Sequence, residues 1–398
     1  MTTNPAGAGA RPAMTVVYAL EEPPDTYSKA LFAAGPTPRS AATASWRPAF
    51  LDELTAAGYD GVVFVPEARD GVFTAAYDHQ VAWERRALNL ADVICFWVPR
   101  DMATMPALTT NVEFGTWASS GKVVFGAPPG APSNRYLRSQ AATLGVPTAD
   151  TLPELVAAAL AKLGGGCVRT GAEREVPAHI WATASFQGWY RALVGAGNTL
   201  CGASVAWSFA TAPERPPFLW ALHVDVYVAA EGRRKTNEVV LSRPDISAVV
   251  AYRRGRRAVD TEVVLVSEFR STGSSIDGYV WELPSGSTDR AGVSAAQLAS
   301  DELAEETGIV VKPSRLRSHG GSQLCATLSA HRSALFSVEL TEAEMAGARG
   351  RVGSVGGSGA GSERTHLQVA RVGDLRGRVD FSALGMIMAV LGGAAAES

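Results

Sequence analysis

Short apolar runs alternate with helical stretches between residues 29 and 160. Helices are expected near Ala49 to Ala57 and around Gln80 to Leu90, and the apolar runs are KALFAAGP, GVVFVP, DVICFWVP and KVVFGAP. Apolar runs of this length are typical of strands buried on both faces, and their alternation with helices indicates a parallel sheet. The sequence therefore predicts an α/β, Rossmann-like domain over residues 14–165, in which helices cover the sheet.

A glycine-rich stretch follows this series. The helix predicted for TLPELVAAALAKL ends in three glycines, which open the segment LGGGCVRTGAERE. Glycine just after a helix marks its end, and a cluster of such residues indicates a loop. We expect a linker over residues 166–175 and a second domain over residues 176–395. Residues 1–13 are small and rich in Gly and Pro, so we expect a disordered tail there.

Composition excludes several classes of protein. The formal net charge is −3, which gives no basic footprint for a nucleic-acid partner. No apolar run reaches the roughly 18–20 residues of a membrane span, and the N-terminus lacks the apolar core of a signal peptide. We therefore expect a cytoplasmic protein with no membrane partner. The cysteines are far apart and form no C-x2-C pair, which argues against a zinc site and against a disulfide framework: Cys95, Cys167, Cys201 and Cys325.

Carboxylates crowd one predicted helix in the C-terminal half. Ser294 and Gln297 have the spacing of a capping box and Gly308 is a stop signal, so the helix is expected from Ala295 to Thr307. Its acidic residues Glu302, Glu305 and Glu306 share one face at i, i+3 and i+4, where each like-charge pair costs roughly 0.2–0.5 kcal/mol. A hard cation such as Mg²⁺ would reverse this repulsion, because it prefers oxygen ligands. A solvated helix face is the alternative interpretation.

The surroundings of this helix carry a family resemblance. Two predicted strands, TEVVLVSEFRS and GYVWELP, precede it, and the second ends in Ser285-Gly286. With the EETG ending they resemble the Nudix box, G-x5-E-x7-R-E-U-x-E-E-x-G-U with U aliphatic, and the strands resemble those of ADP-ribose-type members. The second half of the box is occupied by Glu302, Leu303, Glu305, Glu306, Gly308 and Ile309. The resemblance spans about Val205 to Leu391, with Phe218 to Ala230 as an early strand and SALGMIMAVL as the closing helix.

The Nudix resemblance implies an α+β domain with a mixed sheet between helices. It implies Mg²⁺ or Mn²⁺ held by Glu302, Glu305 and Glu306, with Glu363 as a late ligand, and Mg-dependent hydrolysis of an ADP-ribose-like nucleoside diphosphate derivative. The same three box glutamates would be catalytic, and the substrate would contact Arg270, Glu282 and Gly286. The first half of the box departs from the pattern. Asp301 replaces the usual Arg, Val293 replaces a Glu, and Gly286 fits only if the loop has one extra residue. Slow turnover and binding without turnover are therefore both open.

A second resemblance covers about Val16 to Leu160. The series FAAGP, SWRPAF, VFVPE, QVAWE, ADVICFWVP and VEFGTWASSGK is similar to the nucleoside 2-deoxyribosyltransferase-like family. The resemblance implies that Glu113, in the E-x-G motif, attacks the anomeric carbon of a nucleoside and releases the base. A carboxylate suits this role because the transition state is cation-like and a covalent ester divides one hard step into two. We expect Glu113 at the start of a helix, where the helix dipole favours its ionised form. An ordinary helix-end acid is the alternative.

Further site residues follow from position along the same series. Glu84 or Asp92 would be the second acid, which handles the leaving base. Ligands of parallel sheets bind beyond the carboxyl ends of the strands, so we expect the base or phosphate site to include Gly35, Pro36, Trp46, Arg47 and Trp97. The two tryptophans also fit core positions. An Asp common before the nucleophile in the family is absent from residues 107–111. Hydrolysis, base exchange and nucleotide binding alone all stay open.

The two resemblances together indicate a two-domain nucleotide-processing enzyme. A nucleotide or nucleoside would be its substrate, with Nudix-type hydrolysis in one domain and cleavage or transfer at an N-glycosidic bond in the other. The alternative is a nucleotide-binding sensor in which one or both domains are inactive. Residues 176–210 are aromatic and partly helical and carry no chemical signature, so a lid and a homodimer surface are both open for them.

Overall fold

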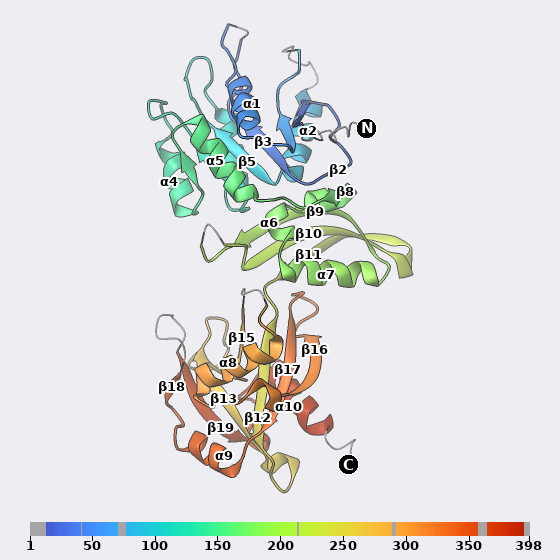
Figure 1. Ribbon diagram of the computed structural model, residues 1–398, viewed down its shortest axis with the longest axis vertical. Coiled ribbons are helices and arrows are strands. Elements are labelled where there is room, and N and C mark those ends of the chain that lie inside the picture. Colours follow the sequence, from blue (N-terminus) through green and yellow to red (C-terminus); the bar gives the residue numbers. More distant parts are fainter. Residues whose placement is uncertain are drawn as a thin grey trace, which may run out of the picture. The chain divides into compact units, whose positions relative to one another are not determined.

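The computed structural model describes residues 13–40, 42–70, 77–212, 215–288, 292–356 and 364–393. The chain divides into two compact units, Met1–Ser242 and Arg243–Ser398 (Figure 1). Residues 1–12 of the predicted tail lie outside the described residues. Among the helices of these ranges, none is long and apolar enough to cross a membrane.

The first unit is built on a six-stranded parallel sheet, in the order β1-β4-β3-β5-β6-β7. The strands are β1 (Thr15–Tyr18), β3 (Ala30–Ala34), β4 (Val62–Val65), β5 (Val93–Trp97), β6 (Val123–Gly126) and β7 (Thr148–Ala149). Every residue of β3, β4, β5 and β6 is buried, which explains why these segments read as unbroken apolar runs. The predicted α/β architecture of this part of the chain is confirmed.

Helices cover both faces of this sheet (Figure 1). Helices α1 (Arg47–Ala56) and α5 (Leu152–Leu163) pack on one face, and α2 (Tyr77–Leu90), α3 (Leu108–Trp117) and α4 (Arg135–Thr143) pack on the other. Helix α5 begins at a complete capping box formed by Thr151 and Glu154 and ends at Gly164, as the sequence indicates. The loops that leave the carboxyl ends of the strands are therefore held between two helical layers.

Residues 166–175, predicted as a linker, pack against the first unit. Strand β8 (Arg169–Thr170) pairs with β2 (Thr26–Tyr27), and the Arg169 side chain is fully buried. The chain continues through η1 (Gly171–Glu175), α6 (Ala178–Trp181) and α7 (Ala184–Gly195) into a separate antiparallel sheet. That sheet consists of β9 (Thr199–Phe209), β10 (Leu219–Val228) and β11 (Arg233–Ser242). The division of the chain thus falls after Ser242 and not at the glycine-rich stretch.

Strand β10 corrects one expectation. The sequence assigns Phe218 to Ala230 to the C-terminal domain as an early strand, but β10 is the central strand of the three-stranded sheet in the first unit. Its buried residues, among them Trp220 and Leu222, pack with Phe186 of α7. Alternation of apolar and polar residues specifies a half-buried strand, and it does not specify which sheet receives that strand.

The second unit contains a mixed sheet, in the order β16-β17-β12-β13-β19-β18, with β14 paired to β13 and β15 to β12. Strands β12 and β17 pair in parallel and the other pairs are antiparallel. The strands are β12 (Ile246–Arg253), β13 (Glu262–Phe269), β14 (Tyr279–Glu282), β15 (Ser285–Ser287), β16 (Arg317–Gln323), β17 (Arg332–Glu339), β18 (Val355–Gly356) and β19 (Thr365–Arg371). Helices α8 (Ala295–Thr307) and α9 (Glu342–Arg349) pack on one face, and α10 (Phe381–Gly393) packs on the other. A mixed sheet between helices is present, as predicted.

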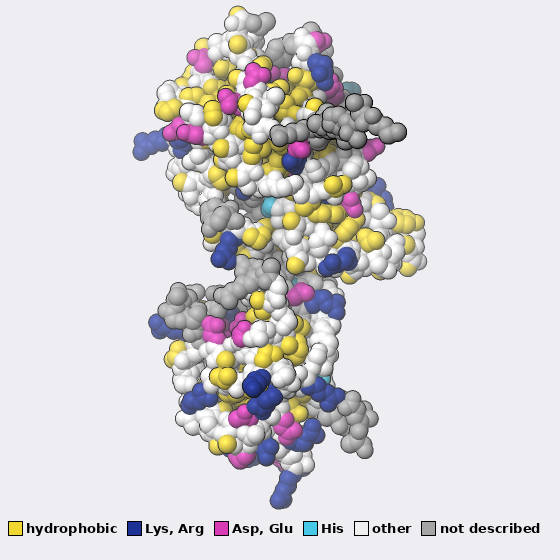
Figure 2. Space-filling model, viewed as in Figure 1, with side chains coloured by type: hydrophobic (Ala, Val, Ile, Leu, Met, Phe, Trp, Pro, Cys, Tyr) yellow, Lys and Arg dark blue, Asp and Glu magenta, His cyan; other side chains and the backbone are white. Residues whose placement is uncertain are grey.

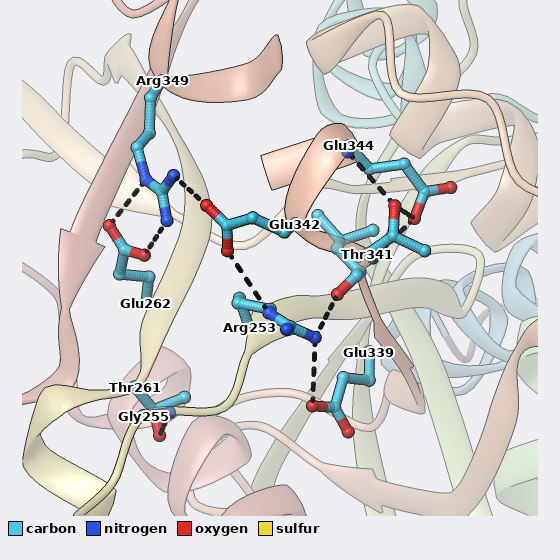
Figure 3. A network of polar contacts seen from close by, with 10 residues as sticks. Arg253, Gly255, Thr261, Glu262, Glu339, Thr341, Glu342, Glu344 and Arg349 are labelled. Carbon is cyan, nitrogen blue, oxygen red and sulfur yellow. Dashed lines mark hydrogen bonds and ion pairs between the residues drawn. The ribbon is translucent and has the colours of Figure 1, made fainter. Parts of the chain in front are cut away.

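Ion pairs tie α9 to the sheet at the surface of the second unit (Figure 3). Arg349 binds Glu262 of β13 at 2.5 Å and Glu342 at 2.8 Å, and Arg253 of β12 reaches Glu342 at 3.5 Å. On the face shown in Figure 2, basic and acidic side chains are interspersed over this unit and form no single basic patch.

Candidate active site

A pocket of about 630 Å³ opens at the carboxyl ends of strands β3 and β4 in the first unit. Its lining includes Gly35 and Pro36 after β3 and Pro66 after β4. Helix α2 contributes Glu84 and α3 contributes Glu113. The carboxyl edge of a parallel sheet is where loops of different strands converge and leave room for a ligand. The structure thus brings Gly35, Pro36, Glu84 and Glu113, all predicted from the sequence, into one cavity.

Glu113 faces this cavity from the middle of α3. Burial raises the pKa of its carboxyl group to about 7, the negative charge of Glu84 adds to the shift, and Arg47 opposes it. The sequence led us to expect the opposite shift, because Glu113 was assigned to a helix start. Helix α3 begins at Leu108, so Glu113 lies beyond the first turn, where the helix dipole has little effect. Loss of hydration therefore decides the charge state of Glu113.

Glu84 is the second acid of the pocket. Gln80, one helical turn earlier on α2, donates a hydrogen bond from Nε2 to Glu84 Oε1 at 3.0 Å. Burial raises the pKa of Glu84, while this hydrogen bond and the charge of Arg47 act in the opposite direction. Two neighbouring carboxyl groups with raised pKa values are an arrangement that acid and base catalysts use.

Arg47 is the positively charged residue that acts on both acids. Only 1% of the surface of Arg47 is exposed. Its guanidinium group donates to the carbonyl oxygens of Ala33 at 3.1 Å and Gly35 at 2.8 Å. It also pairs with Glu67 at 2.5 Å. These bonds fix the loop that follows β3. Arg47 is therefore part of the pocket wall, and its donors are engaged by the protein itself.

Asp92 lies away from the pocket, which corrects its assignment as an alternative second acid. Its carboxylate is 1% exposed and forms a bidentate ion pair with Arg169 at 2.6 and 2.7 Å. It also accepts hydrogen bonds from the backbone N–H groups of Ala30 at 2.8 Å and Ala178 at 2.7 Å. All of these partners hold the protein together. Glu84 is the acid that the fold places beside Glu113.

Trp46 and Trp97 do not line the pocket. They belong to the core between the sheet and helices α1 and α5, and Trp46 packs edge-on against Phe50 at 5.8 Å. Both approach Gly35 closely, since a Cβ atom there would lie 2.2 Å from the Trp97 carbonyl oxygen and 2.8 Å from the Trp46 ring. The tryptophans support the backbone under the pocket, and a side chain at position 35 would displace it.

Sequence reasoning missed several lining residues. Gln80 stands four residues before Glu84 on a predicted helix, so the i, i+4 rule could have found it. Leu108 and Val112 form an exposed apolar stripe on α3 along the pocket wall. No short motif marks such residues, because their role depends on which face of the helix meets the cavity.

The acidic helix of the second unit is α8, with the predicted ends. Ser294 accepts a hydrogen bond from the Gln297 N–H at 3.1 Å, but the Gln297 side chain donates to Asp301 at 2.7 Å and so does not complete the capping box. Glu305 is exposed, whereas Glu302 and Glu306 are half-buried. The three carboxylates therefore do not share one environment.

Glu302 and Glu306 face strand β15. A Cβ atom on Gly286 would lie 2.2 Å from Glu302 Oε1, and Glu306 accepts a hydrogen bond from the Ser285 N–H at 3.1 Å. Burial raises the pKa of Glu306 to about 9, and Glu302, Glu268 and Glu282 add to the shift. The fold thus brings several acids of α8, β13 and β14 together.

Arg270 is already bound within this acidic region. It pairs with Glu282 at 2.6 Å and with Glu268 at 2.9 Å. Within the described ranges, no group of three or more His, Cys, Asp or Glu side chains is arranged to hold a metal ion. Glu363, expected as a late ligand, lies outside those ranges. Glu302, Glu305 and Glu306 thus do not form a metal site with the other described side chains, and the Mg²⁺ or Mn²⁺ expectation stays a prediction.

The first unit contains a parallel sheet with helices on both faces, and a pocket with two acids lies at the carboxyl edge of that sheet. This part of the chain is therefore an α/β domain with a candidate ligand site. Residues 28–131 match the model of a family described as nucleoside 2-deoxyribosyltransferase like. The match runs from β3 past β6, includes Glu84 and Glu113, and confirms the resemblance over that stretch. It includes no residue of the second unit, whose Nudix-like identity stays a prediction. No curated protein matches the chain.

Proposed function

We propose that the first unit cleaves the N-glycosidic bond of a nucleoside or nucleotide, with Glu113 as nucleophile and Glu84 as proton donor to the leaving base. One observation carries the proposal: two half-buried carboxyl groups face one pocket, and the charge of Glu84 raises the pKa of Glu113. Burying two neighbouring carboxyl groups does not favour the stability of the fold. A reaction through a cationic transition state, however, uses one carboxyl group as an anion and the other as an acid.

The chemistry balances with these two residues. A carboxylate oxygen of Glu113 forms a bond to the anomeric carbon as the bond from that carbon to the base nitrogen breaks. Glu84 transfers its proton to the departing base, which leaves neutral. The ester on Glu113 is then opened by water or by a second base, and Glu84 recovers a proton from that nucleophile. Splitting the reaction in this way lowers the barrier of each step.

The raised pKa values indicate that both groups can exchange protons, and the resemblance to the family, in which the E-x-G glutamate is the nucleophile, assigns the roles. With a pKa of about 7, Glu113 is partly ionised near neutral pH, and the positive charge of Arg47 favours the ionised form. Burial favours the protonated form of Glu84, the form that can protonate a base. The acceptor is left open between water and a second base, because the Asp common before the nucleophile in the family is absent from residues 107–111.

A binding role without turnover is the second candidate for this pocket. The same burial that raises both pKa values supports it, since two protonated carboxyl groups can hold a ligand by hydrogen bonds without attacking it.

Release of free base, measured by chromatography, separates these functions. Four proteins are incubated with nucleosides and nucleoside monophosphates: the parent chain, Glu113→Gln, Glu84→Gln and Asp52→Asn. Asp52→Asn is the control, because it alters an exposed carboxylate on α1. Glu113→Gln is expected to lose several orders of magnitude in rate. The rate of base release by Glu84→Gln should fall most for bases that are poor leaving groups and least for bases that depart without protonation. Base release by Glu113→Gln at the parent rate would remove Glu113 from the mechanism, and none by the parent would leave a binding pocket.

A further inference from the structure

Two further arginines line the pocket. Arg39 follows β3 and Arg85 lies on α2, and both side chains are exposed. The Arg39 backbone N–H donates to the Thr104 carbonyl oxygen at 3.1 Å, which fixes its loop beside the start of α3. In contrast to Arg47, neither guanidinium group has a hydrogen-bond or ion-pair partner among the side chains and backbone that the structure describes. Their donors are free to meet a ligand.

These two arginines are not among the charges that shift the pKa values of the acid pair. Arg47 is the cation that acts on Glu113 and on Glu84, and neither Arg39 nor Arg85 is among the charges that shift either carboxyl group. The lining of the pocket therefore includes two arginines in addition to Arg47 and the acid pair at which bond cleavage is proposed. A ligand that uses both the acids and these two arginines carries a negative charge away from its reacting bond.

An apolar wall completes the pocket. Leu108 and Val112 lie one turn apart on α3 and are 62% and 70% exposed, and Trp117 follows on the same helix. Large apolar side chains exposed in a concave site are characteristic of ligand contact, and a flat heterocyclic base fits such a surface. The volume of about 630 Å³ is in the range of pockets for ligands of nucleotide size.

We propose that the pocket selects nucleoside 5′-monophosphates over nucleosides, with Arg39 and Arg85 binding the phosphate. This inference rests on the proposed function, because it assigns the sugar to Glu113 and the base to the wall of Leu108 and Val112. A guanidinium group matches a phosphate in charge and in the spacing of its donors, and such charge-assisted bonds are about twice as strong as neutral ones. A neutral nucleoside would leave both arginines without a partner.

Binding to a variant that cannot form the ester tests the inference apart from turnover. In the Glu113→Gln background, calorimetry compares a panel of 2′-deoxynucleoside 5′-monophosphates with the matching nucleosides. At least tenfold tighter binding of the monophosphates is expected, with a preference that falls as salt is added. Adding Arg39→Gln and Arg85→Gln should remove the preference. Arg86→Gln is the matched control, because Arg86 lies next to Arg85 on α2, is exposed and pairs with Glu22 at 2.8 Å. It should leave the preference unchanged.

The outcomes distinguish this inference from the proposed function. Equal binding of monophosphates and nucleosides, or a preference that survives the double arginine variant, overturns the inference. Binding of neither ligand overturns it as well. Base release from nucleosides by the parent chain would in those cases still support the proposed function. A phosphate preference that depends on both arginines, with no base release by the parent from any substrate, would instead refute the proposed cleavage and leave phosphate recognition in place.

Discussion

Glu113 is an acid whose charge the folded chain disfavours. Its pKa is about 7, against an ordinary value of 4.5, because the carboxyl group is buried beside Glu84. The folded chain holds this proton more tightly than the unfolded chain does, so this residue lowers the stability as pH rises from about 4.5 to about 7. Above that range the loss is complete, at up to about 3 kcal/mol for a shift of this size.

Glu113→Gln is therefore expected to raise the free energy of unfolding at pH 8 and to change it little at pH 4. The neutral amide removes the buried charge and keeps the shape of the side chain. Urea unfolding followed by tryptophan fluorescence measures this, since eight of the nine tryptophans precede Arg243 and report on the first unit. Asp52→Asn should show no such dependence on pH. A variant equally or less stable than the parent at pH 8 would contradict the buried-charge account.

Asp92 is an acid that the folded chain requires. Its ion pair with Arg169 is buried on both sides, and removal of one partner of such a pair leaves an unpaired charge, at a cost of about 3–5 kcal/mol. Asp92→Asn should therefore destabilise the first unit by an amount of that order in the same fluorescence assay. Asp60→Asn breaks a partly exposed pair with Lys29 and should cost about 1 kcal/mol or less. Similar small losses in both variants would show that Asp92 is not a structural anchor.

At the scale of single elements, local sequence signals determine where a helix begins and ends, whereas tertiary contacts determine which face of the helix meets the pocket. Helix α8 was predicted to the residue because Ser294 caps one end and Gly308, in the left-handed conformation at φ 67°, closes the other. Glu84 and Asp92 were equivalent in the sequence, since both are acids that precede Glu113 in the same β/α series. Only the packing of α2 shows that Glu84 meets the pocket whereas Asp92 meets Arg169. Arg39 and Arg85 were missed for the same reason.

Helix α9 depends on Glu344 at its first turn. The Arg315 guanidinium lowers the pKa of this carboxyl group to about 2, and the hydrogen bond from the Thr341 N–H adds to the shift. Because the folded-state pKa is lowered, this stabilisation is present above about pH 4.5 and is lost as pH falls toward 2. Glu344→Gln should speed amide exchange in α9 roughly tenfold at pH 6, which corresponds to about 1.4 kcal/mol, an amount of the order of one hydrogen bond to a charged group.

Hydrogen exchange with mass spectrometry checks this helix directly. The difference between Glu344→Gln and the parent should shrink at pH 3. The control is Glu342→Gln, which weakens the exposed pair with Arg349 in the network of Figure 3 and should change exchange by less than the Glu344 variant. An effect of Glu344→Gln that is the same at pH 3 and pH 6 would contradict the assignment to a carboxylate.

At the scale of the whole chain, two compact units were expected and their boundary was not found from the sequence. Three glycines after α5 suggested a linker, but the following residues insert Arg169 into the core beside Asp92. Glycine clusters mark a change of direction as readily as a change of domain. A chain ending at Ser242 should therefore fold with the parent's fluorescence transition, whereas one ending at Gly165 leaves Asp92 without its partner.

Solubility and urea unfolding of the two truncated chains measure this difference. The chain ending at Gly165 should be several kcal/mol less stable than the chain ending at Ser242, or insoluble, since the loss includes the buried ion pair. Equal stability of the two would place the boundary at the glycine-rich stretch after all.

The covalent step at Glu113 is the centre of the proposed function, and intact-mass spectrometry of the acid-quenched chain tests it most directly. The parent chain is mixed with a 2′-deoxynucleoside or its 5′-monophosphate from which it releases base, quenched within the first turnovers, and digested for peptide mapping. The account predicts one added deoxyribosyl group, carried by the peptide that contains Glu113 and absent from Glu113→Gln. Base release at full rate with no adduct, or with an adduct on another residue, would contradict it.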